Sequence, residues 1–186
     1  HPKKDSEAFI ELNQNLRFLT AKPVIYAANV DEDSLAEDNA YVKQVREIAS
    51  EQGALVLKLC AKLEAEIVGL DEDEQRDYLD MLGIEERGLA KVIRTCYETL
   101  GLISYFTFND KRIDVWTVQD GWAAPKAAGV IHTDFEKGFI RAEVIAFEAF
   151  AKHRSRAAVK DAGQMRVEGK EYLVHDGDIM NFLTSS

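Results

Sequence analysis

The chain has 186 residues, of which 46% are hydrophobic and 30% are charged, a balance typical of a folded globular protein. Its net charge of −10 lies mostly in residues 1–100, where 12 basic residues stand against 21 acidic ones. This excess disfavours non-specific nucleic-acid binding by the first part, and no apolar run approaches the roughly 20 residues that span a bilayer. Residues 101–186 hold 11 basic and 12 acidic residues, so a local basic surface remains open there.

The two cysteines, Cys60 and Cys96, stand far apart and form neither a disulfide framework nor a Cys-x-x-Cys pair. The chain opens without the pattern of a signal peptide. We therefore expect a reducing, cytoplasmic setting. The histidines lack the pairing or spacing of a ligand set, and we predict no metal site.

Residues 1–20 carry apolar side chains at steps of three and four, which predicts a helix that ends before Pro23. The short apolar run from Val24 to Ala28 predicts a buried parallel strand. A polar tetrad follows it directly: Asn29, Val30, Asp31 and Glu32. Ligands in open α/β sheets bind beyond the carboxyl ends of the strands, and an amide three residues before a carboxylate can face a purine base. The alternative is a plain polar turn with an Asx cap.

A βαβ unit extends from this strand. Asn39 is the N-cap candidate of a helix that ends at Gly53, and the apolar residues 54–59 predict a second strand. Two strands joined by a helix should be parallel, with a right-handed crossover. The second strand ends at Cys60-Ala61-Lys62, again at a carboxyl end. Further helices that would cover this small sheet are predicted at residues 62–70, 71–82 and 88–100.

The hydrophobic period changes after Gly101, where we predict a small mixed β domain. Two strands are predicted at 102–108 and 112–118, around a polar turn at 109–111. Then follow a small-residue loop at 121–129, a polar turn or short helix at 132–138 capped by Asp134, and an edge or half-buried strand at 140–147. The last predicted elements are a helix at 147–162 and three short strands at 164–167, 172–174 and 179–183.

The ends of the two parallel strands resemble the last two base-binding signatures of P-loop GTPases. The tetrad from Asn29 to Glu32 stands where those proteins usually have Asn-Lys-x-Asp, and Cys60-Ala61-Lys62 stands where they have Ser-Ala-Lys. One group departs from the guanine signature in this way, the YchF or Obg-like ATPase subfamily. Later segments look like the C-terminal TGS domain of that subfamily, and the run from His132 to Phe139 is the most specific: residues 124–129, 131–143 and 175–182.

The resemblance implies a fold class of α/β plus α+β: an incomplete P-loop GTPase-like α/β domain followed by a TGS domain with a ubiquitin-like β-grasp fold. Residues 1–20 would be the end of an α-helical coiled-coil insertion, 21–100 the C-terminal part of the nucleotide-binding domain, and 101–186 the TGS domain. The subfamily is implied to hydrolyse ATP with Mg²⁺, and GTP to varying degrees. Its implied partner in translation is the ribosome, through RNA or ribosomal protein. We expect ATP to be preferred over GTP, and no membrane partner.

The resemblance also implies a set of base-binding residues: Asn29, Val30, Glu32, Cys60 and Ala61. The Asn29 amide can both donate and accept, whereas Glu32 in place of aspartate disfavours guanine. For Cys60 itself, the alternative is a small buried hydrophobic residue. The family's phosphate-binding loop Gly-x-x-x-x-Gly-Lys-Ser/Thr is missing from this sequence, and the Asp-x-x-Gly segment that would serve Mg²⁺ and the γ-phosphate lies upstream in the family. We therefore expect no catalytic residue in this chain, no hydrolysis by the chain alone and no tightly bound cofactor.

The second hypothesis is that residues 101–186 dock on RNA or on a ribosomal protein. The candidate contacts are basic: Lys137, Arg141, Lys152, Arg154, Arg156 and Lys160. Candidate stacking or apolar anchors are His132, Phe135 and Phe139. The alternatives are a core position for the aromatic residues and an ordinary solvated face for the basic helix. The alternative function is accordingly a self-contained RNA- or protein-binding module without nucleotide hydrolysis.

Overall fold

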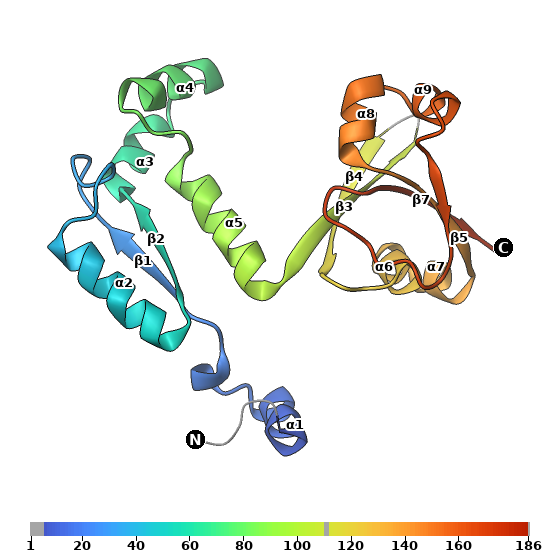
Figure 1. The fold of residues 1–186 in the computed structure, drawn as a ribbon, viewed down its shortest axis with the longest axis horizontal. Helices are drawn as coiled ribbons and strands as arrows, with labels where there is room; N and C mark the ends of the chain where they lie inside the picture. Colours follow the sequence, from blue (N-terminus) through green and yellow to red (C-terminus); the bar gives the residue numbers. More distant parts are fainter. Residues whose placement is uncertain (1–5, 110–111, 186) are drawn as a thin grey trace. The chain divides into compact units, whose positions relative to one another are not determined.

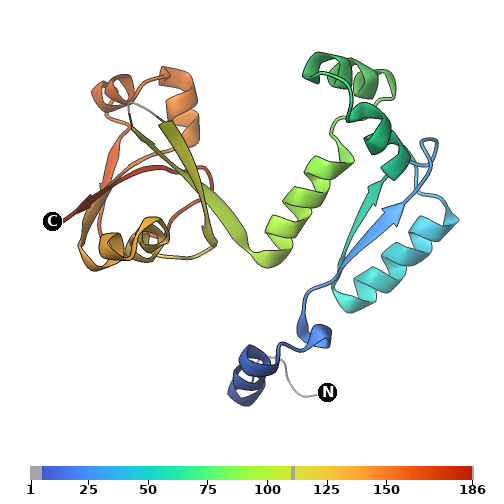
Figure 2. The ribbon, with the colours of Figure 1, turned by 180° about the vertical axis from the view of Figure 1, so that it is seen from behind.

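The computed structural model describes residues 6–109 and 112–185. The chain divides into two compact units, His1–Thr99 and Leu100–Ser186, which we call the N-unit and the C-unit (Figures 1 and 2). The part of the predicted first helix at residues 1–5 and the predicted turn residues Asp110 and Lys111 lie outside the described residues. In the described part of the chain, no helix combines the length and the apolar character needed to cross a membrane.

The N-unit is built on the predicted βαβ unit. Strands β1 (Ile25–Asn29) and β2 (Leu55–Leu59) are parallel and in register, and helix α2 (Ala40–Gln52) connects them. Asn39 caps α2, because its Oδ1 accepts a hydrogen bond from the Val42 N–H at 3.0 Å. Gly53 ends α2 with a φ of +63°, a left-handed conformation that favours glycine. The predictions for both ends of this helix are confirmed.

The strand pair buries less of its surface than the sequence predicts. Leu57 of β2 is 2% exposed, whereas β1, which is described in full, has no fully buried residue. The prediction of a buried strand at Val24–Ala28 is therefore wrong. The physical reason is that β1 has one strand neighbour, β2, within the described chain, and α2 packs on one face of the pair.

Two short helices after β2 form a separate small core. α3 (Ala61–Ile67) and α4 (Glu72–Met81) bury Leu63, Ile67 and Leu79 together with Cys60. A capping box starts α4, in which the side chain of Asp71 accepts from the Glu74 N–H and that of Glu74 accepts from the Asp71 N–H. This core positions the first turn of α3 at the end of β2.

Two helices of the N-unit leave their apolar faces partly uncovered. α1 (Glu7–Leu16) ends earlier than predicted because Arg17 adopts a left-handed φ of +49°, and the 3₁₀ helix η1 (Leu19–Ala21) follows it. α5 (Gly88–Leu100) has the predicted bounds but, although every residue of it is described, it buries none. Leu89 and Ile93 are each 52% exposed, so the predicted inward face of α5 is covered only in part, at the half-buried Val92 and Cys96.

The C-unit is a five-stranded mixed sheet in the order β4-β3-β7-β5-β6. Its strands are β3 (Leu102–Asn109), β4 (Arg112–Gln119), β5 (Phe139–Ile145), β6 (Arg166–Glu168) and β7 (Ile179–Thr184). β3 and β4 form an antiparallel hairpin, and β7 runs parallel to β3 and antiparallel to β5. The predicted strand at 140–147 is not an edge strand, because β5 pairs on both sides. The half-buried alternative is confirmed, because Ala142 and Val144 are fully buried whereas Arg141 is exposed and Glu143 is half-buried.

Helix α6 (Ala124–Ile131) stands where the sequence predicted a small-residue loop. Pro125 is compatible with the first turn of a helix, which needs no N–H there. Ala124, Ala127 and Ala128 are all fully buried, so the small residues serve close packing rather than flexibility. The next helix, α7 (Thr133–Lys137), is capped by His132, whose Nδ1 accepts from the Asp134 N–H at 3.2 Å. The prediction of Asp134 as the cap is therefore wrong.

The single helix predicted at 147–162 is two helices, α8 (Phe147–His153) and α9 (Arg156–Asp161). Arg154 ends α8 with a φ of +56°, and Ser155 caps α9 by accepting a hydrogen bond from the Ala158 N–H at 3.2 Å. Residues 172–174, predicted as a strand, form an isolated bridge at Leu173, because their backbone bonds to the loop before α6.

Gly138 provides a test of packing in the C-unit. A Cβ at this position would lie 2.9 Å from the carbonyl oxygen of Ser185 and 3.1 Å from that of Asp134. Backbone hydrogen bonds hold both residues, because the Gly138 N–H donates to the Asp134 oxygen and the Ser185 N–H donates to the Gly138 oxygen, each at 2.8 Å. Gly138→Ala should therefore lower the free energy of unfolding by about 1–3 kcal/mol. Urea denaturation measures this change. Gly169→Ala, with nothing within 4 Å of the added Cβ, is the matched control; equal stability of the two variants would contradict the packing described.

Asp38 provides a pH test in the N-unit. It accepts hydrogen bonds from Arg46 and, at 3.0 Å, from Lys58 Nζ, and these bonds lower the pKa of Asp38 from 3.8 to about 2. Because the folded pKa is depressed, this stabilisation is complete above the ordinary pKa and is lost as the pH falls towards 2. Asp38→Asn should therefore lower the urea midpoint at neutral pH, and the difference from wild type should shrink on acidification. The exposed neighbour Asp33→Asn is the control; a difference that did not change with pH would contradict this role.

Candidate functional site

The two predicted base-binding segments lie side by side at the carboxyl end of the strand pair. Asn29, the last residue of β1, is in register with Leu59, the last residue of β2. The Val30 N–H then donates to the Leu59 carbonyl oxygen at 2.9 Å and extends the pairing by one step. In open α/β sheets this edge is where ligands bind.

A side-chain hydrogen bond joins the two segments. The N–H of Ala61, the first residue of α3, donates to Asn29 Oδ1 at 2.9 Å. This N–H needs an outside partner, because the first N–H groups of a helix have no acceptor within the helix. Within residues 6–109 and 112–185, Asn29 Nδ2 donates to no protein group, and the residue is exposed. Asn29 therefore presents to solvent both amide hydrogens and the second lone pair of its oxygen.

A second contact joins the same segments. Lys62 Nζ lies 3.2 Å from Glu32 Oε1 and 3.6 Å from Glu66 Oε1. The hydrogen bond from Lys62 to Glu32 is the main cause that raises the pKa of Lys62. The lysine side chain is 74% exposed and that of Glu32 is 32% exposed, so salt will screen this pair. The predicted set of base-binding residues omitted Lys62, because a contact across 30 positions leaves no local pattern.

Cys60 and Val30 are wholly or partly buried, and each has a backbone group bonded within the protein. The Cys60 side chain is 4% exposed within the core of α3 and α4, and its carbonyl oxygen accepts from the Glu64 N–H at 3.1 Å. The alternative offered by the sequence, a small buried hydrophobic residue, describes this side chain correctly. Val30 is half-buried, and its N–H is bonded to Leu59.

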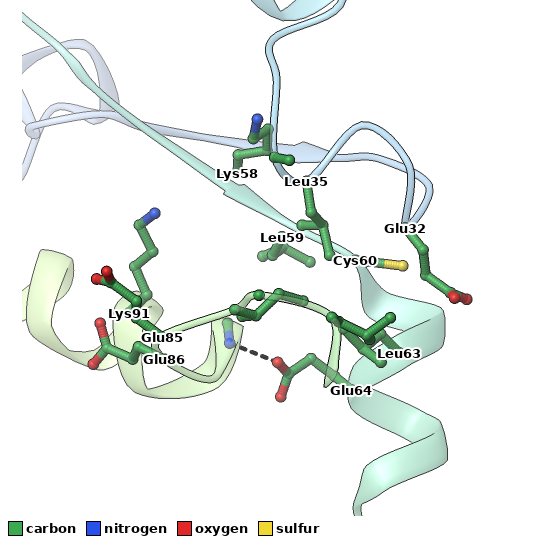
Figure 3. A pocket seen from close by; sticks show the side chains of 15 residues that line it. Glu32, Leu35, Lys58, Leu59, Cys60, Leu63, Glu64, Glu85, Glu86 and Lys91 are labelled. Atoms are coloured by element: carbon green, nitrogen blue, oxygen red, sulfur yellow. Dashed lines mark hydrogen bonds between the residues drawn. The ribbon is translucent and has the colours of Figure 1, made fainter. Parts of the chain in front are cut away.

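A pocket of about 450 Å³ adjoins this edge (Figure 3). Glu32 and Cys60 line it, together with side chains from the α4–α5 turn and the start of α5. Glu64 lies at its wall and accepts a hydrogen bond from the Gly88 N–H at 2.6 Å, which Figure 3 shows as a dashed line. Arg87 donates to the same carboxylate at 3.4 Å. These bonds satisfy Glu64 and fix the start of α5, so the carboxylate has a structural role.

The predicted docking residues belong to the C-unit. Five of the six basic side chains are exposed: Lys137, Arg141, Lys152, Arg154 and Lys160. Arg156 differs, because it is half-buried and paired with Glu143, which also accepts from Asn181 Nδ2 at 2.8 Å. Of the three candidate anchors, His132 is exposed, Phe135 is half-buried and Phe139 is 3% exposed. The core alternative is therefore correct for Phe139.

The described ranges, 6–109 and 112–185, contain no candidate metal site. No three His, Cys, Asp or Glu side chains there come close enough to hold a metal ion together. His132 is instead used as a helix cap, and His175 Nδ1 lies 3.0 Å from the Tyr172 hydroxyl.

Similar proteins were found by comparison with family models and with curated sequences. Residues 102–185 match the family model YchF-GTPase_C, described as "Protein of unknown function (DUF933)". The ribosome-binding ATPase YchF of Pasteurella multocida (strain Pm70) is 54% identical over 165 residues, which are 89% of this chain and 45% of that protein. The protein of the same description from Bacillus subtilis (strain 168) is 45% identical over 174 residues, 92% of this chain and 48% of that protein. The chain thus spans about half the length of the curated relatives it matches.

Solved structures agree with this relationship. The Schizosaccharomyces pombe YchF GTPase is similar with a TM-score of 0.84 and 33% identity, covering 98% of this chain and 49% of that one. A GTP-binding protein from Pyrococcus horikoshii OT3 is similar with a TM-score of 0.61 and 21% identity, covering 89% and 46%, a likeness of fold alone. The resemblance inferred from the sequence is therefore confirmed: the chain belongs to the YchF family and corresponds to the C-terminal part of its members.

Proposed function

We propose that the N-unit is the base-recognition part of a nucleotide-binding domain, and that the whole protein is a ribosome-associated ATPase of the YchF type. The names of the curated relatives, ribosome-binding ATPases, support this assignment. The observation that carries it is the hydrogen bond from the Ala61 N–H to Asn29 Oδ1 at 2.9 Å. It fixes an exposed amide at the carboxyl edge of two parallel strands.

The orientation of this amide favours adenine. Adenine presents an acceptor, N7, beside a donor, its 6-amino group, whereas guanine presents two acceptors, N7 and O6. Asn29 Nδ2 can donate to N7 while the second lone pair of Oδ1 accepts from the 6-amino group. Guanine O6 needs a donor at that place, and the Ala61 N–H is already bonded to Asn29. The arrangement therefore supports a preference for ATP over GTP.

The phosphates require other groups. Phosphoryl transfer depends on a phosphate cradle and Mg²⁺, and this sequence lacks the family's phosphate-binding loop. Its one Asp-x-x-Gly run, Asp80 to Gly83, stands at the end of helix α4 and does not follow a strand. We propose that the rest of the parent protein supplies the phosphate cradle and holds ATP with Mg²⁺. The chain by itself then binds ATP weakly through the base and does not hydrolyse it.

The C-unit is proposed to be a TGS domain of the β-grasp type that docks on RNA or ribosomal protein. The parallel pairing of β7 with the first strand of the β3–β4 hairpin supports the β-grasp assignment. Exposed Lys152, Arg154 and Lys160, on and beside α8 and α9, support a contact with phosphates. A module that binds RNA or protein without any nucleotide is the alternative, and the two experiments below separate it from the main proposal.

The first experiment measures ATP and GTP binding by nuclear magnetic resonance titration. Asn29→Ala should weaken ATP binding about tenfold, because a bidentate base contact contributes roughly 1–3 kcal/mol of discrimination. Asp31→Ala, in the same exposed loop, removes a carboxylate that bonds to Ser34 and should leave binding unchanged. Equal affinities for ATP and GTP, or full ATP binding by Asn29→Ala, would count against the proposal.

The second experiment measures co-sedimentation with ribosomes over a range of salt concentrations. Lys152→Glu combined with Arg154→Glu should weaken association and reduce the slope of log K against log salt by about two, one for each lost phosphate contact. Lys43→Glu combined with Lys170→Glu makes the same charge change at other exposed positions and is the control. Identical behaviour of the two double variants would remove α8 and its turn from the docking surface.

A further inference from the structure

We propose that Lys62 is a specificity-determining residue of the base site. Its ion pair with Glu32 keeps that carboxylate from accepting hydrogen bonds from the N–H groups of a guanine base. This inference rests on the proposed function of the N-unit. Its starting point is the 3.2 Å contact between Lys62 Nζ and Glu32 Oε1, which links the first turn of α3 to the loop after β1.

The chemistry of the two purines explains why this carboxylate matters. On its Watson–Crick edge guanine offers two adjacent donors, N1–H and the 2-amino group, which a free carboxylate can accept together. Adenine has an acceptor, N1, on that edge and no 2-amino group. The greater length of Glu32 displaces its carboxylate from the position of the usual aspartate, which is why the sequence predicts that it disfavours guanine. A free Glu32 carboxylate that bent back to this edge would still favour guanine and repel adenine N1. Selectivity is a difference between two affinities, so occupying Glu32 lowers the affinity for the wrong base.

The structure holds Glu32 where this competition can occur. The carboxylate is partly exposed and lines the pocket beside the strand edge. The backbone carbonyl of Glu32 accepts from the Leu35 N–H at 3.1 Å, which fixes the turn that carries the side chain. Lys62 follows Ala61 directly, so one helix start engages the first and the last side chain of the tetrad. Ala61 bonds to the amide of Asn29, and Lys62 bonds to the carboxylate.

A second carboxylate lies near the lysine on the same helix. Glu66 lies one turn further along α3, with Oε1 3.6 Å from Lys62 Nζ. The ammonium group is thus shared between Glu32 and Glu66. This geometry supplies a matched control, because Glu66→Gln removes a carboxylate from Lys62 without changing Glu32.

The test compares AMP and GMP binding to the isotope-labelled chain. The two nucleotides carry the same phosphate, so the ratio of their affinities cancels its attraction to the lysine. Wild type should favour AMP, and Lys62→Met should reduce that preference about three- to fivefold, the range of an exposed ion pair. Glu66→Gln should keep the ratio within about twofold. Adding Lys62→Met to Glu32→Gln should cause no further change, because the carboxylate is already absent.

Salt gives an independent readout. Rising ionic strength should reduce the AMP preference of wild type but not that of Lys62→Met, since only wild type contains the Lys62–Glu32 ion pair that salt screens. An unchanged ratio in Lys62→Met, while wild type binds AMP, would overturn this inference and leave the proposed function intact. An equal effect of Lys62→Met with and without Glu32 would also overturn it. Failure of wild type to bind either nucleotide would overturn the proposed function and this inference together.

Discussion

The hydrogen bond from the Ala61 N–H to Asn29 Oδ1 is the contact on which the candidate site depends. It spans 32 positions of sequence and ties the end of β1 to the first turn of α3. The parallel register brings the two strand ends level, and the core of α3 and α4 holds the helix start in place. The bond then fixes both the orientation of the Asn29 amide and the position from which Lys62 reaches Glu32.

In the proposed nucleotide site, the contacts with the base and the contacts with the phosphates have different roles. In our proposal the exposed Asn29 amide and the carboxylate–ammonium pair discriminate between purines. We assign catalysis and the larger share of the affinity to a phosphate cradle and Mg²⁺ in the rest of the parent protein. The N-unit has surfaces compatible with this division: β1 pairs with β2 alone among the described strands, and α5 leaves Leu89 and Ile93 half-exposed.

Local chemistry made part of this structure predictable. Asn39 and Gly53 mark the ends of α2 because capping requires an amide acceptor and a left-handed residue, and both signals are short-range. The candidate site is a prediction from the residues that follow two apolar runs. Tertiary packing decided the rest. Ala127 and Ala128 form a helix because they fit against the sheet, and β5 is interior because β6 and β7 pair with it on both sides. The contact of Lys62 with Glu32 depends on the register of the parallel strands, which no short sequence pattern specifies.

Amide hydrogen exchange at Ala61 tests the central contact most directly. In wild type this exposed amide should be protected, because its N–H is bonded to Asn29 Oδ1. In Asn29→Ala the exchange should accelerate about fivefold or more, as expected for the loss of a bond that contributes roughly 1 kcal/mol, while Asp31→Ala leaves it unchanged. Equal exchange rates at Ala61 in wild type and Asn29→Ala would contradict the proposed architecture of the site.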